Sequence, residues 1–400
     1  MSPFNPQFAE RIAGCNPSAI REILKVVALP DIISFAGGMP APELVPFEAF
    51  EAAAARALGS RENALQSLQY GPSEGYGPLR RLLAADLAEE GITAREGQIL
   101  ITTGSQQALD MVAKLFLDPG DEVVVGDPTF LGALQSFNSY QANYVTVPVD
   151  EEGMRADALE SVLANMRPKL IYAIPSFQNP TGVSMSEARK RAVYDVARRH
   201  GVPILEDDPY GDLYYGGSRP TTIKSLDDGD GVILLRTFSK ILAPGLRLGY
   251  VVMDESYMAK ILPLKQSADL HSSAFNQVMV YEFLKAGVLP GHLERLRSVY
   301  AARRDLMLEL MARHFPEGYT WTRPEGGMFT WVTMPEGMQA TKVLEEAVAQ
   351  KVAFIPGAPF YALGGGENTF RLNFSNASEE NIRLGIERLG AVLKKAAALV

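Results

Sequence analysis

Short apolar segments alternate with helical patterns from Gln98 onward, and this alternation restricts the fold more than any other feature of the chain. The apolar segments are QILITT, DEVVVG, KLIYAIP, VPILED, GVILLRT and LGYVVM. Most of them are apolar throughout rather than at alternate positions, as expected for strands that helices cover on both faces. The segments SQQALDMVAKLF and SEARKRAVYDVARRH between them have the spacing of helices. The pattern predicts an α/β domain with a largely parallel sheet.

The length and the change of pattern along the chain predict two domains. The chain has 400 residues, too many for one ordinary core. After about Gly287 the alternation stops, and a long charged helix leads to short strands and further helices. We therefore expect residues 46–286 to form a large α/β domain. Residues 1–45 and 287–400 are expected to form a smaller α+β domain.

Composition excludes several classes of partner. The net charge of −9 argues against nucleic acids and anionic membranes, because both bind basic surfaces. The amino terminus has no apolar signal segment, and no apolar run approaches the roughly 18 residues of a membrane-spanning helix. The single cysteine, Cys15, fits a reducing cytoplasm. The four histidines lack the spacing of metal ligands, so we expect no metal.

The segment RTFSKILAPGLRLGY places a lysine just past a predicted buried strand. Ligands of open α/β sheets bind at this carboxyl edge. Burial there would lower the pKa of Lys240 and make its amine a nucleophile toward a carbonyl group. The hydroxyls of Thr237 and Ser239 and the guanidinium of Arg247 could surround a dianion such as phosphate. The alternative is a lysine and an arginine that flank a surface turn.

The segment TTGSQQALD contains a second candidate anion site. A strand ends, Gly104 turns the chain, and Ser105 and Gln106 begin a helix. The N–H groups and the dipole at a helix N-terminus favour a phosphate. Ser105 could instead be an N-cap residue, and both roles are compatible.

Two further strand ends carry polar side chains. In PSFQNPTG, two prolines and a glycine hold Asn179 at the sheet edge, where it could bind a ligand oxygen or cap the turn before Pro180. In EDDPYGDL, a buried carboxylate needs a cationic partner, and a protonated pyridine nitrogen would suit Asp207. Tyr210 could direct its hydroxyl to the same ligand. A solvated acidic turn fits Asp208 better than Asp207.

Two arginines lie outside the predicted α/β domain. Arg371 is flanked by apolar residues on a predicted strand, which favours carboxylate binding over a structural ion pair. Arg21 lies on an early helix, where a surface role is the better interpretation of that residue alone. Gly38, in the pair Gly37-Gly38, lets the backbone approach a ligand closely. One ligand explains these sites together: pyridoxal 5'-phosphate, with a substrate that presents a carboxylate to an arginine.

The chain resembles the fold-type I, class I/II aminotransferases that use pyridoxal 5'-phosphate, and within them the 2-aminoadipate/kynurenine aminotransferase branch. The resemblance rests on SFAGGMPAPELVP, LQYGPSEGYGPLR, TTGSQQALD, PSFQNPTG, EDDPYGDL, TFSKILAPGLRLGY and RLNFSNAS in that family's order. It implies the fold of that family, with a large domain built on a mostly parallel seven-stranded sheet and a smaller α+β domain. It also implies a mobile N-terminal segment and a homodimer with shared active sites.

The resemblance assigns roles to individual residues. Lys240 is implied to form an aldimine with the cofactor and to move the proton between Cα and C4', and Asp207 to pair with the pyridinium nitrogen. Tyr70 is implied to come from the neighbouring subunit. Phe130 stands where relatives usually have tyrosine, so stacking on the cofactor ring is kept and a hydroxyl contact is lost. The remaining implied cofactor ligands are Asn179, Tyr210, Ser105, Gln106, Thr237, Ser239 and Arg247. The implied substrate ligands are Arg371, Asn179, Gly38, Tyr70, Ser18 and Arg21.

The resemblance implies transfer of an amino group from an amino acid to a 2-oxo acid such as 2-oxoglutarate. Arg21 suits a distal carboxylate, as in 2-aminoadipate or glutamate, and the same segment can move aside for aromatic or branched-chain donors. Two alternative functions are compatible with the same fold. One is a β-lyase, decarboxylase or retro-aldolase with the same cofactor. The other is the ligand-sensing half of a transcription regulator, which the acidic charge and the early start of the fold disfavour.

Overall fold

The computed structural model describes residues 7–14 and 31–398, and its largest element is an eight-stranded sheet. The spatial order is β2-β9-β8-β7-β6-β3-β4-β5. Neighbours from β8 to β4 are parallel, whereas β9 is antiparallel to β8 and β2, and β5 is antiparallel to β4. The strands are β2 (Ile99–Thr102), β3 (Glu122–Asp127), β4 (Asn143–Asp150), β5 (Gly153–Met154), β6 (Leu170–Ala173), β7 (Ile204–Asp207), β8 (Val232–Thr237) and β9 (Gly249–Val252).

All six predicted strands are present in this sheet, as β2, β3, β6, β7, β8 and β9. The sheet has one strand more than the seven expected, because β5 adds a two-residue strand beside β4. The strand β4 lies near the edge of the sheet and exposes part of its length, so its sequence is not uniformly apolar. The α/β class and the largely parallel sheet are confirmed.

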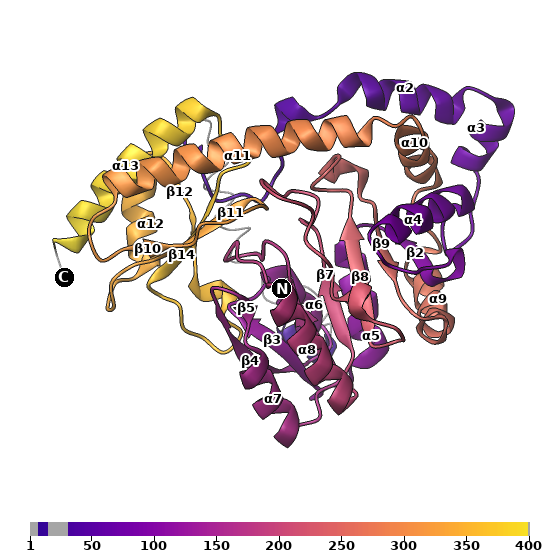
Figure 1. The fold of residues 1–400 in the computed structure, drawn as a ribbon, viewed down its shortest axis with the longest axis horizontal. Coiled ribbons are helices and arrows are strands. Elements are labelled where there is room, and N and C mark those ends of the chain that lie inside the picture. The colour runs from indigo at the N-terminus through magenta and orange to yellow at the C-terminus, as the bar shows by residue number, and fades with distance from the viewer. Residues whose placement is uncertain (1–6, 15–30, 399–400) are drawn as a thin grey trace.

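Helices cover both faces of the large sheet (Figure 1). Side chains of α5 (Ser105–Phe116), α6 (Leu131–Asn138) and α9 (Glu255–Asp269) share one apolar cluster with one face. Side chains of α7 (Ala156–Asn165) and α8 (Glu187–His200) share another with the opposite face. Neighbouring strand residues such as Ile204 and Leu205 therefore both lie in apolar surroundings, which explains the uniformly apolar strands.

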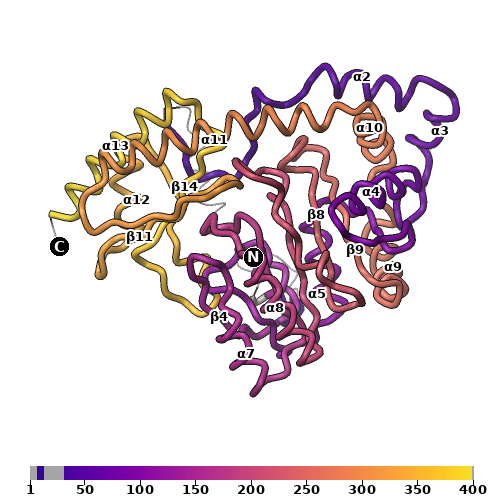
Figure 2. The backbone as a smooth tube through the Cα atoms, viewed as in Figure 1, coloured from indigo at the N-terminus to yellow at the C-terminus, as the bar shows by residue number. Residues whose placement is uncertain are grey.

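Further helices pack at the β2 and β9 end of the sheet (Figure 1). They are α2 (Phe47–Leu58), α3 (Arg61–Leu68), α4 (Gly77–Glu89) and α10 (Ala274–Lys285). From this end the long helix α11 (Leu289–His314) runs across the molecule toward a second sheet, as Figure 2 shows. This helix is the long charged segment expected after Gly287.

The second sheet is antiparallel and has four strands in the order β10-β11-β14-β13. These strands are β10 (Thr320–Trp321), β11 (Phe329–Thr333), β13 (Ile355–Pro356) and β14 (Thr369–Asn373). The helices α12 (Ala340–Ala349) and α13 (Glu379–Ala397) belong to the same region. Near the amino terminus, β1 (Ile33–Ser34) pairs with β12 (Val352–Ala353). Early residues thus join the carboxyl-terminal elements, although the domain boundaries given above stay a prediction. Among the described residues, no helix has the length and apolar character needed to cross a membrane.

Candidate active site at the carboxyl edge of the large sheet

Three neighbouring parallel strands end at the candidate site. Asn179 lies in the loop after β6, Asp207 is the last residue of β7, and Lys240 follows β8. Arg371, on β14 of the small sheet, reaches the same place, because its Nη1 donates a hydrogen bond to Asn179 Oδ1 at 2.6 Å. The structure therefore brings together predicted residues from four separate segments, two of which are 192 positions apart.

Lys240 presents a partly buried amine with a low pKa. Its Nζ donates a hydrogen bond to the carbonyl oxygen of Gly38 at 2.6 Å, so the Gly37-Gly38 segment reaches the site as predicted. Burial lowers the pKa of Lys240 to about 8, and the positive charges of Arg371 and Arg247 act in the same direction. Near neutral pH a larger fraction of this amine is unprotonated than for a solvated lysine, as attack on a carbonyl group requires.

Asp207 supplies a buried carboxylate with one free oxygen. The side chain is 2% exposed, and burial raises its pKa to about 7. The hydroxyl of Tyr172 donates a hydrogen bond to Oδ2 at 2.8 Å, whereas Oδ1 is buried without a hydrogen-bond partner among the described residues. A buried carboxylate oxygen without a donor is costly unless a ligand supplies one. A protonated ring nitrogen would be such a donor.

Asp208 differs from the expected solvated turn. It is buried, and its Oδ2 accepts hydrogen bonds from Arg219 Nη2 at 2.8 Å and Arg236 Nε at 3.2 Å. Burial alone would raise the pKa of Asp208, but the two guanidinium groups lower it below its usual value. The solvated-turn interpretation of Asp208 is wrong, because the two arginines neutralise this carboxylate inside the protein. It is a structural ion pair behind the site.

Asn179 and Tyr210 both lie near Arg371. Both are buried, and the Asn179 side chain is hydrogen-bonded to the Tyr210 hydroxyl. Burial raises the pKa of Tyr210 above its usual value, so its hydroxyl keeps its proton at neutral pH. The Asn179 oxygen accepts from Arg371, so this side chain points into the site and is not merely a cap for the turn before Pro180.

Hydroxyls, a guanidinium and a helix N-terminus meet beside Lys240. The Thr237 hydroxyl lies 3.0 Å from Ser239 Oγ, and Arg247 Nη1 donates to the same Oγ at 3.4 Å. Gly104, with φ 78°, is the N-cap of α5, and a Cβ there would lie 2.6 Å from Arg247 Nη2. Ser105 is the first helical residue, so the interpretation of Ser105 as the N-cap is wrong. The arrangement offers N–H and O–H donors and one positive charge to a dianion.

Gln106 and Phe130 lie side by side next to this anion site. The Gln106 amide donates to the carbonyl oxygen of Gly132 at 3.0 Å and to Ser136 Oγ at 2.8 Å. The side chain of Gln106 thus connects α5 to α6. At the helix N-terminus only the backbone N–H of Gln106 is available to an anion. Phe130 is the N-cap residue of α6, and a Cβ at Gly132 would lie 2.5 Å from its ring. The absence of a side chain at Gly132 is therefore what makes room for the ring.

Arg371 is a buried cation held between aromatic rings. Its guanidinium carbon lies 4.1 Å from the centroid of Phe329 and 5.2 Å from that of Phe360, and Nη2 donates to the carbonyl oxygen of Ala36 at 2.8 Å. Burial lowers the pKa of Arg371 to about 10, and Nε has no hydrogen-bond partner in the described part of the chain. No carboxylate forms an ion pair with Arg371 there, so the geometry agrees with the expected carboxylate site rather than a structural ion pair.

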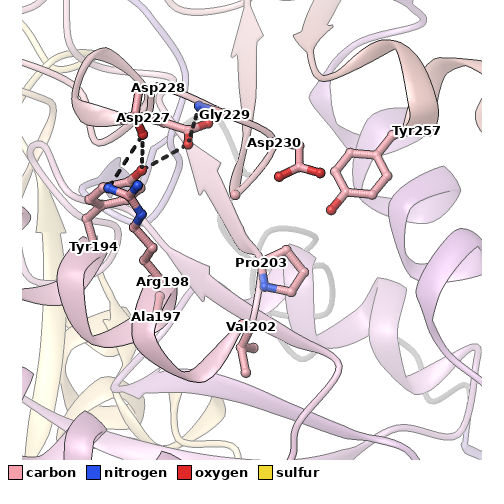
Figure 3. A pocket seen from close by; sticks show the side chains of 12 residues that line it. Tyr194, Ala197, Arg198, Val202, Pro203, Asp227, Asp228, Gly229, Asp230 and Tyr257 are labelled. Carbon is pink, nitrogen blue, oxygen red and sulfur yellow. Dashed lines mark hydrogen bonds and ion pairs between the residues drawn. The ribbon is translucent and has the colours of Figure 1, made fainter.

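Tyr70 is not part of this cluster. It is 79% exposed and packs edge-on against His271 with ring centroids 5.8 Å apart. Ser18 and Arg21 lie outside the described residues. A separate pocket, shown in Figure 3, is lined by Tyr194, Asp227 and their neighbours. It lies beside the first residues of β7 and β8, at the edge of the sheet opposite to Lys240.

Sequence reasoning missed Tyr172 and the carbonyl oxygen of Ala36. Tyr172 lies on β6 opposite Leu205 of β7, two residues before Asp207. Residues two apart on a strand point to the same face, so knowledge of the strand register would have placed the Tyr172 hydroxyl beside Asp207. The hydrogen bond from Arg371 to the carbonyl oxygen of Ala36 depends on how the amino-terminal segment crosses the small sheet. No local sequence pattern predicts this hydrogen bond.

Comparisons with known proteins agree with this geometry. The sequence model of the family "Aminotransferase class I and II" matches residues 36–389. The chain is 47% identical to 2-aminoadipate transaminase of Thermus thermophilus, over 96% of this chain and 95% of that protein. It is 42% identical to aromatic-amino-acid aminotransferase 1 of Thermococcus litoralis, over 98% of this chain and 95% of that protein. The crystal structure of the Thermus thermophilus α-aminoadipate aminotransferase in complex with N-(5'-phosphopyridoxyl)-L-leucine has a TM-score of 0.92 at 43% identity and covers 98% of each chain.

Proposed function

This chain belongs to the family of class I and II aminotransferases, and we propose that it transfers amino groups with pyridoxal 5'-phosphate bound covalently to Lys240. The main support for the proposal is the set of groups that surround the Lys240 amine. Its low pKa, the free oxygen of Asp207 and the donors around Arg247 fit the aldehyde, the ring nitrogen and the phosphate of one ligand. The cofactor, when bound, withdraws electrons from the substrate Cα.

In the proposal, different residues of the site bind different groups of the cofactor. In this proposal Ser105, Thr237, Ser239 and Arg247 hold the phosphate, together with the backbone N–H of Gln106. Asn179 and Tyr210 bind the phenolic oxygen, and Asp207 keeps the ring nitrogen protonated. Phe130 stacks on the ring through its aromatic face, which needs no hydroxyl group.

Lys240 has a second task in the proposal. When free, its amine would act as the base that takes the proton from the substrate Cα and would return this proton at C4' of the cofactor. The pKa of about 8 suits a base that must accept and release a proton near neutral pH. Gly38, whose carbonyl oxygen accepts from Nζ, keeps the amine on the side of the site where Arg371 also lies.

Arg371 is proposed to bind the α-carboxylate of the amino acid, because the fork of a guanidinium matches a carboxylate. As donors we propose 2-aminoadipate and glutamate, with aromatic and branched-chain amino acids as further candidates, and 2-oxoglutarate as acceptor. The names of the two curated relatives support the acidic and aromatic donors, and the leucine adduct of the Thermus thermophilus enzyme supports a branched-chain donor. Arg21 is proposed to bind the distal carboxylate of acidic donors, with Ser18 beside it. A cytoplasmic location stays a prediction from the sequence.

The alternative reactions are not favoured. A guanidinium that holds the α-carboxylate disfavours decarboxylation, and the relatives at 42% and 47% identity are aminotransferases rather than lyases or regulators. The half-reaction provides the direct test. The cofactor-loaded protein is mixed with one amino acid and no acceptor, using 2-aminoadipate, glutamate, kynurenine, phenylalanine, leucine and alanine in turn.

We expect about one equivalent of pyridoxamine 5'-phosphate and of 2-oxo acid per chain, and recovery of the starting cofactor when 2-oxoglutarate is added. Continued product release without an acceptor, with the cofactor unchanged, would show a lyase instead. The relative rates of the six amino acids then give the donor preference.

We also propose a homodimer in which Tyr70 completes the site of the partner subunit. Tyr70 is exposed, as are Leu65 and Leu68 on the adjacent helix α3. A contiguous exposed group of this kind favours a protein partner. Because Tyr70 and Lys240 would serve different sites, a dimer of one Tyr70→Ala chain and one Lys240→Ala chain contains one complete site.

Such mixed dimers, purified with two different affinity tags, should therefore recover about half of the wild-type activity per dimer. Pure Tyr70→Ala dimers should be about tenfold less active than wild type, because each site lacks a donor to the phosphate. Mixed dimers without activity above the Tyr70→Ala level would exclude the shared site.

A further inference from the structure

The hydroxyl of Tyr172 is the one hydrogen-bond donor to the Asp207 carboxylate among the described residues. The two side chains come from adjacent strands, β6 and β7, and point to the same face of the sheet. Tyr172 is 1% exposed, and its ring packs edge-on against Phe137 of α6 with centroids 5.8 Å apart. The position of the Tyr172 hydroxyl is therefore fixed twice: strand pairing holds the backbone of Tyr172, and packing against α6 holds its ring.

The hydrogen bond from Tyr172 determines which carboxylate oxygen of Asp207 remains available to a ligand. Of the two carboxylate oxygens, Oδ2 accepts from Tyr172 at 2.8 Å and Oδ1 has no partner in the described part of the protein. A buried carboxylate with one oxygen fixed cannot rotate freely about its last torsion, so the other oxygen faces one direction. Burial and the charge of Asp207 raise the pKa of Tyr172 well above its usual value, so the phenol keeps its proton and donates it to the carboxylate.

We propose that Tyr172 is a positioning residue, which keeps Asp207 ionised and aims its free Oδ1 at the ring nitrogen of the cofactor. This inference rests on the proposed function, since it concerns the same site. It assigns no contact with the substrate or the cofactor to Tyr172, which acts only through Asp207.

The groups around Asp207 have opposing effects on its charge. Burial raises its pKa, and so does the neighbouring carboxylate of Asp208. The hydrogen bond from Tyr172 and the positive charge of Lys240 lower it. Tyr210 also lies near this pair, but it keeps its proton at neutral pH. Of the two groups that lower the pKa of Asp207, Tyr172 has the larger effect, and its hydroxyl would stay in place when the Lys240 amine holds the cofactor.

The test removes one oxygen atom by the substitution Tyr172→Phe. Tyr194→Phe is a matched control, because Tyr194 is also buried and donates its hydroxyl to a carboxylate, Asp227 Oδ1 at 3.1 Å, in the pocket remote from Lys240 (Figure 3). Apoprotein of each variant is titrated with pyridoxal 5'-phosphate by equilibrium dialysis, at pH values above and below about 7. This measurement does not depend on turnover.

For Tyr172→Phe we expect cofactor binding at neutral pH to weaken about tenfold, the size of a lost hydrogen bond to a charged group. Ionised Asp207 strengthens binding, so in the wild type and in both single tyrosine variants the affinity falls as the pH falls through the pKa of this carboxyl. Without the hydroxyl that pKa is higher, so the midpoint of the loss should move to higher pH. Tyr194→Phe should keep the wild-type affinity and midpoint. Equal curves for Tyr172→Phe and Tyr194→Phe would overturn the inference.

A second comparison separates positioning from a general loss of structure. In an Asp207→Asn background the carboxylate charge is absent, so adding Tyr172→Phe should change cofactor affinity by less than about twofold. A tenfold effect in both backgrounds would mean that Tyr172 supports the fold and not Asp207. If the wild-type protein itself does not bind the cofactor, the proposed function fails, which is a different outcome from failure of this inference.

Discussion

Replacement of Lys240 by alanine is expected to lower the rate of amino transfer by about 1000-fold or more, since the proposed base for the proton transfer at the substrate Cα is removed. The amine of Lys240 is partly buried, and desolvation lowers its pKa to about 8. No second lysine donates to Gly38 among the described residues, and the neighbouring cation is an arginine that remains protonated. Single-turnover conversion of an amino acid by the cofactor-loaded variant measures this loss.

The matched control is Lys190→Met, since Lys190 is another lysine whose amine is held inside the protein by hydrogen bonds. Its Nζ donates to the carbonyl oxygen of Thr221 at 2.7 Å and to Ser176 Oγ at 3.3 Å, away from Gly38. This variant should lose stability but keep its activity within about threefold once folded, because it changes a core contact and not the site. Retention of more than a tenth of the wild-type rate by Lys240→Ala would refute the role of Lys240.

The second large effect is expected for Arg371→Ala, which should lower kcat/KM by about 1000-fold for every amino acid donor. The α-carboxylate is common to all donors, and the site offers it a buried guanidinium whose charge-assisted hydrogen bonds are strengthened by burial. Arg371→Lys should recover little of the loss, because an ammonium lacks the planar fork. The measurement compares kcat/KM for an acidic and an apolar donor.

Arg304→Ala is the matched control for Arg371. Arg304 also stacks on an aromatic ring, with 5.1 Å between its guanidinium carbon and the Tyr215 centroid, and donates to a carbonyl oxygen, that of Pro324 at 2.9 Å. Its loss should affect stability more than kcat/KM. A decrease with Arg371→Ala that is confined to acidic donors would place the distal carboxylate there instead, and equal effects of the two arginine variants would leave Arg371 without a special role.

The sequence was sufficient for those parts of the fold and site that follow from local pattern. Uniformly apolar runs identified the strands at or after whose ends Asn179, Asp207 and Lys240 lie, and the carboxyl ends of neighbouring parallel strands share one edge of a sheet. The three residues could thus be predicted to meet. The strand β4 was not among the predicted runs, since it is partly exposed and less uniformly apolar.

Features that depend on tertiary packing were not predictable in this way. Asp208 is buried because Arg219, Arg236 and Glu90, from distant segments, form a network of ion pairs around it. The direction of the Gln106 amide depends on how closely α6 approaches α5. The role of Tyr172 requires the register between β6 and β7, which no local pattern gives.

The central claim is that the cofactor is attached to Lys240, and chemical reduction tests it most directly. Treatment of the cofactor-loaded protein with borohydride fixes an imine as a stable amine, and peptide mass spectrometry then identifies the modified lysine. Two other lysines, Lys190 and Lys265, are fully buried and provide an internal comparison. We predict the pyridoxyl group on Lys240 alone. A pyridoxyl group on Lys190, Lys265 or any other lysine, or none in a protein that still transfers amino groups, would contradict this account.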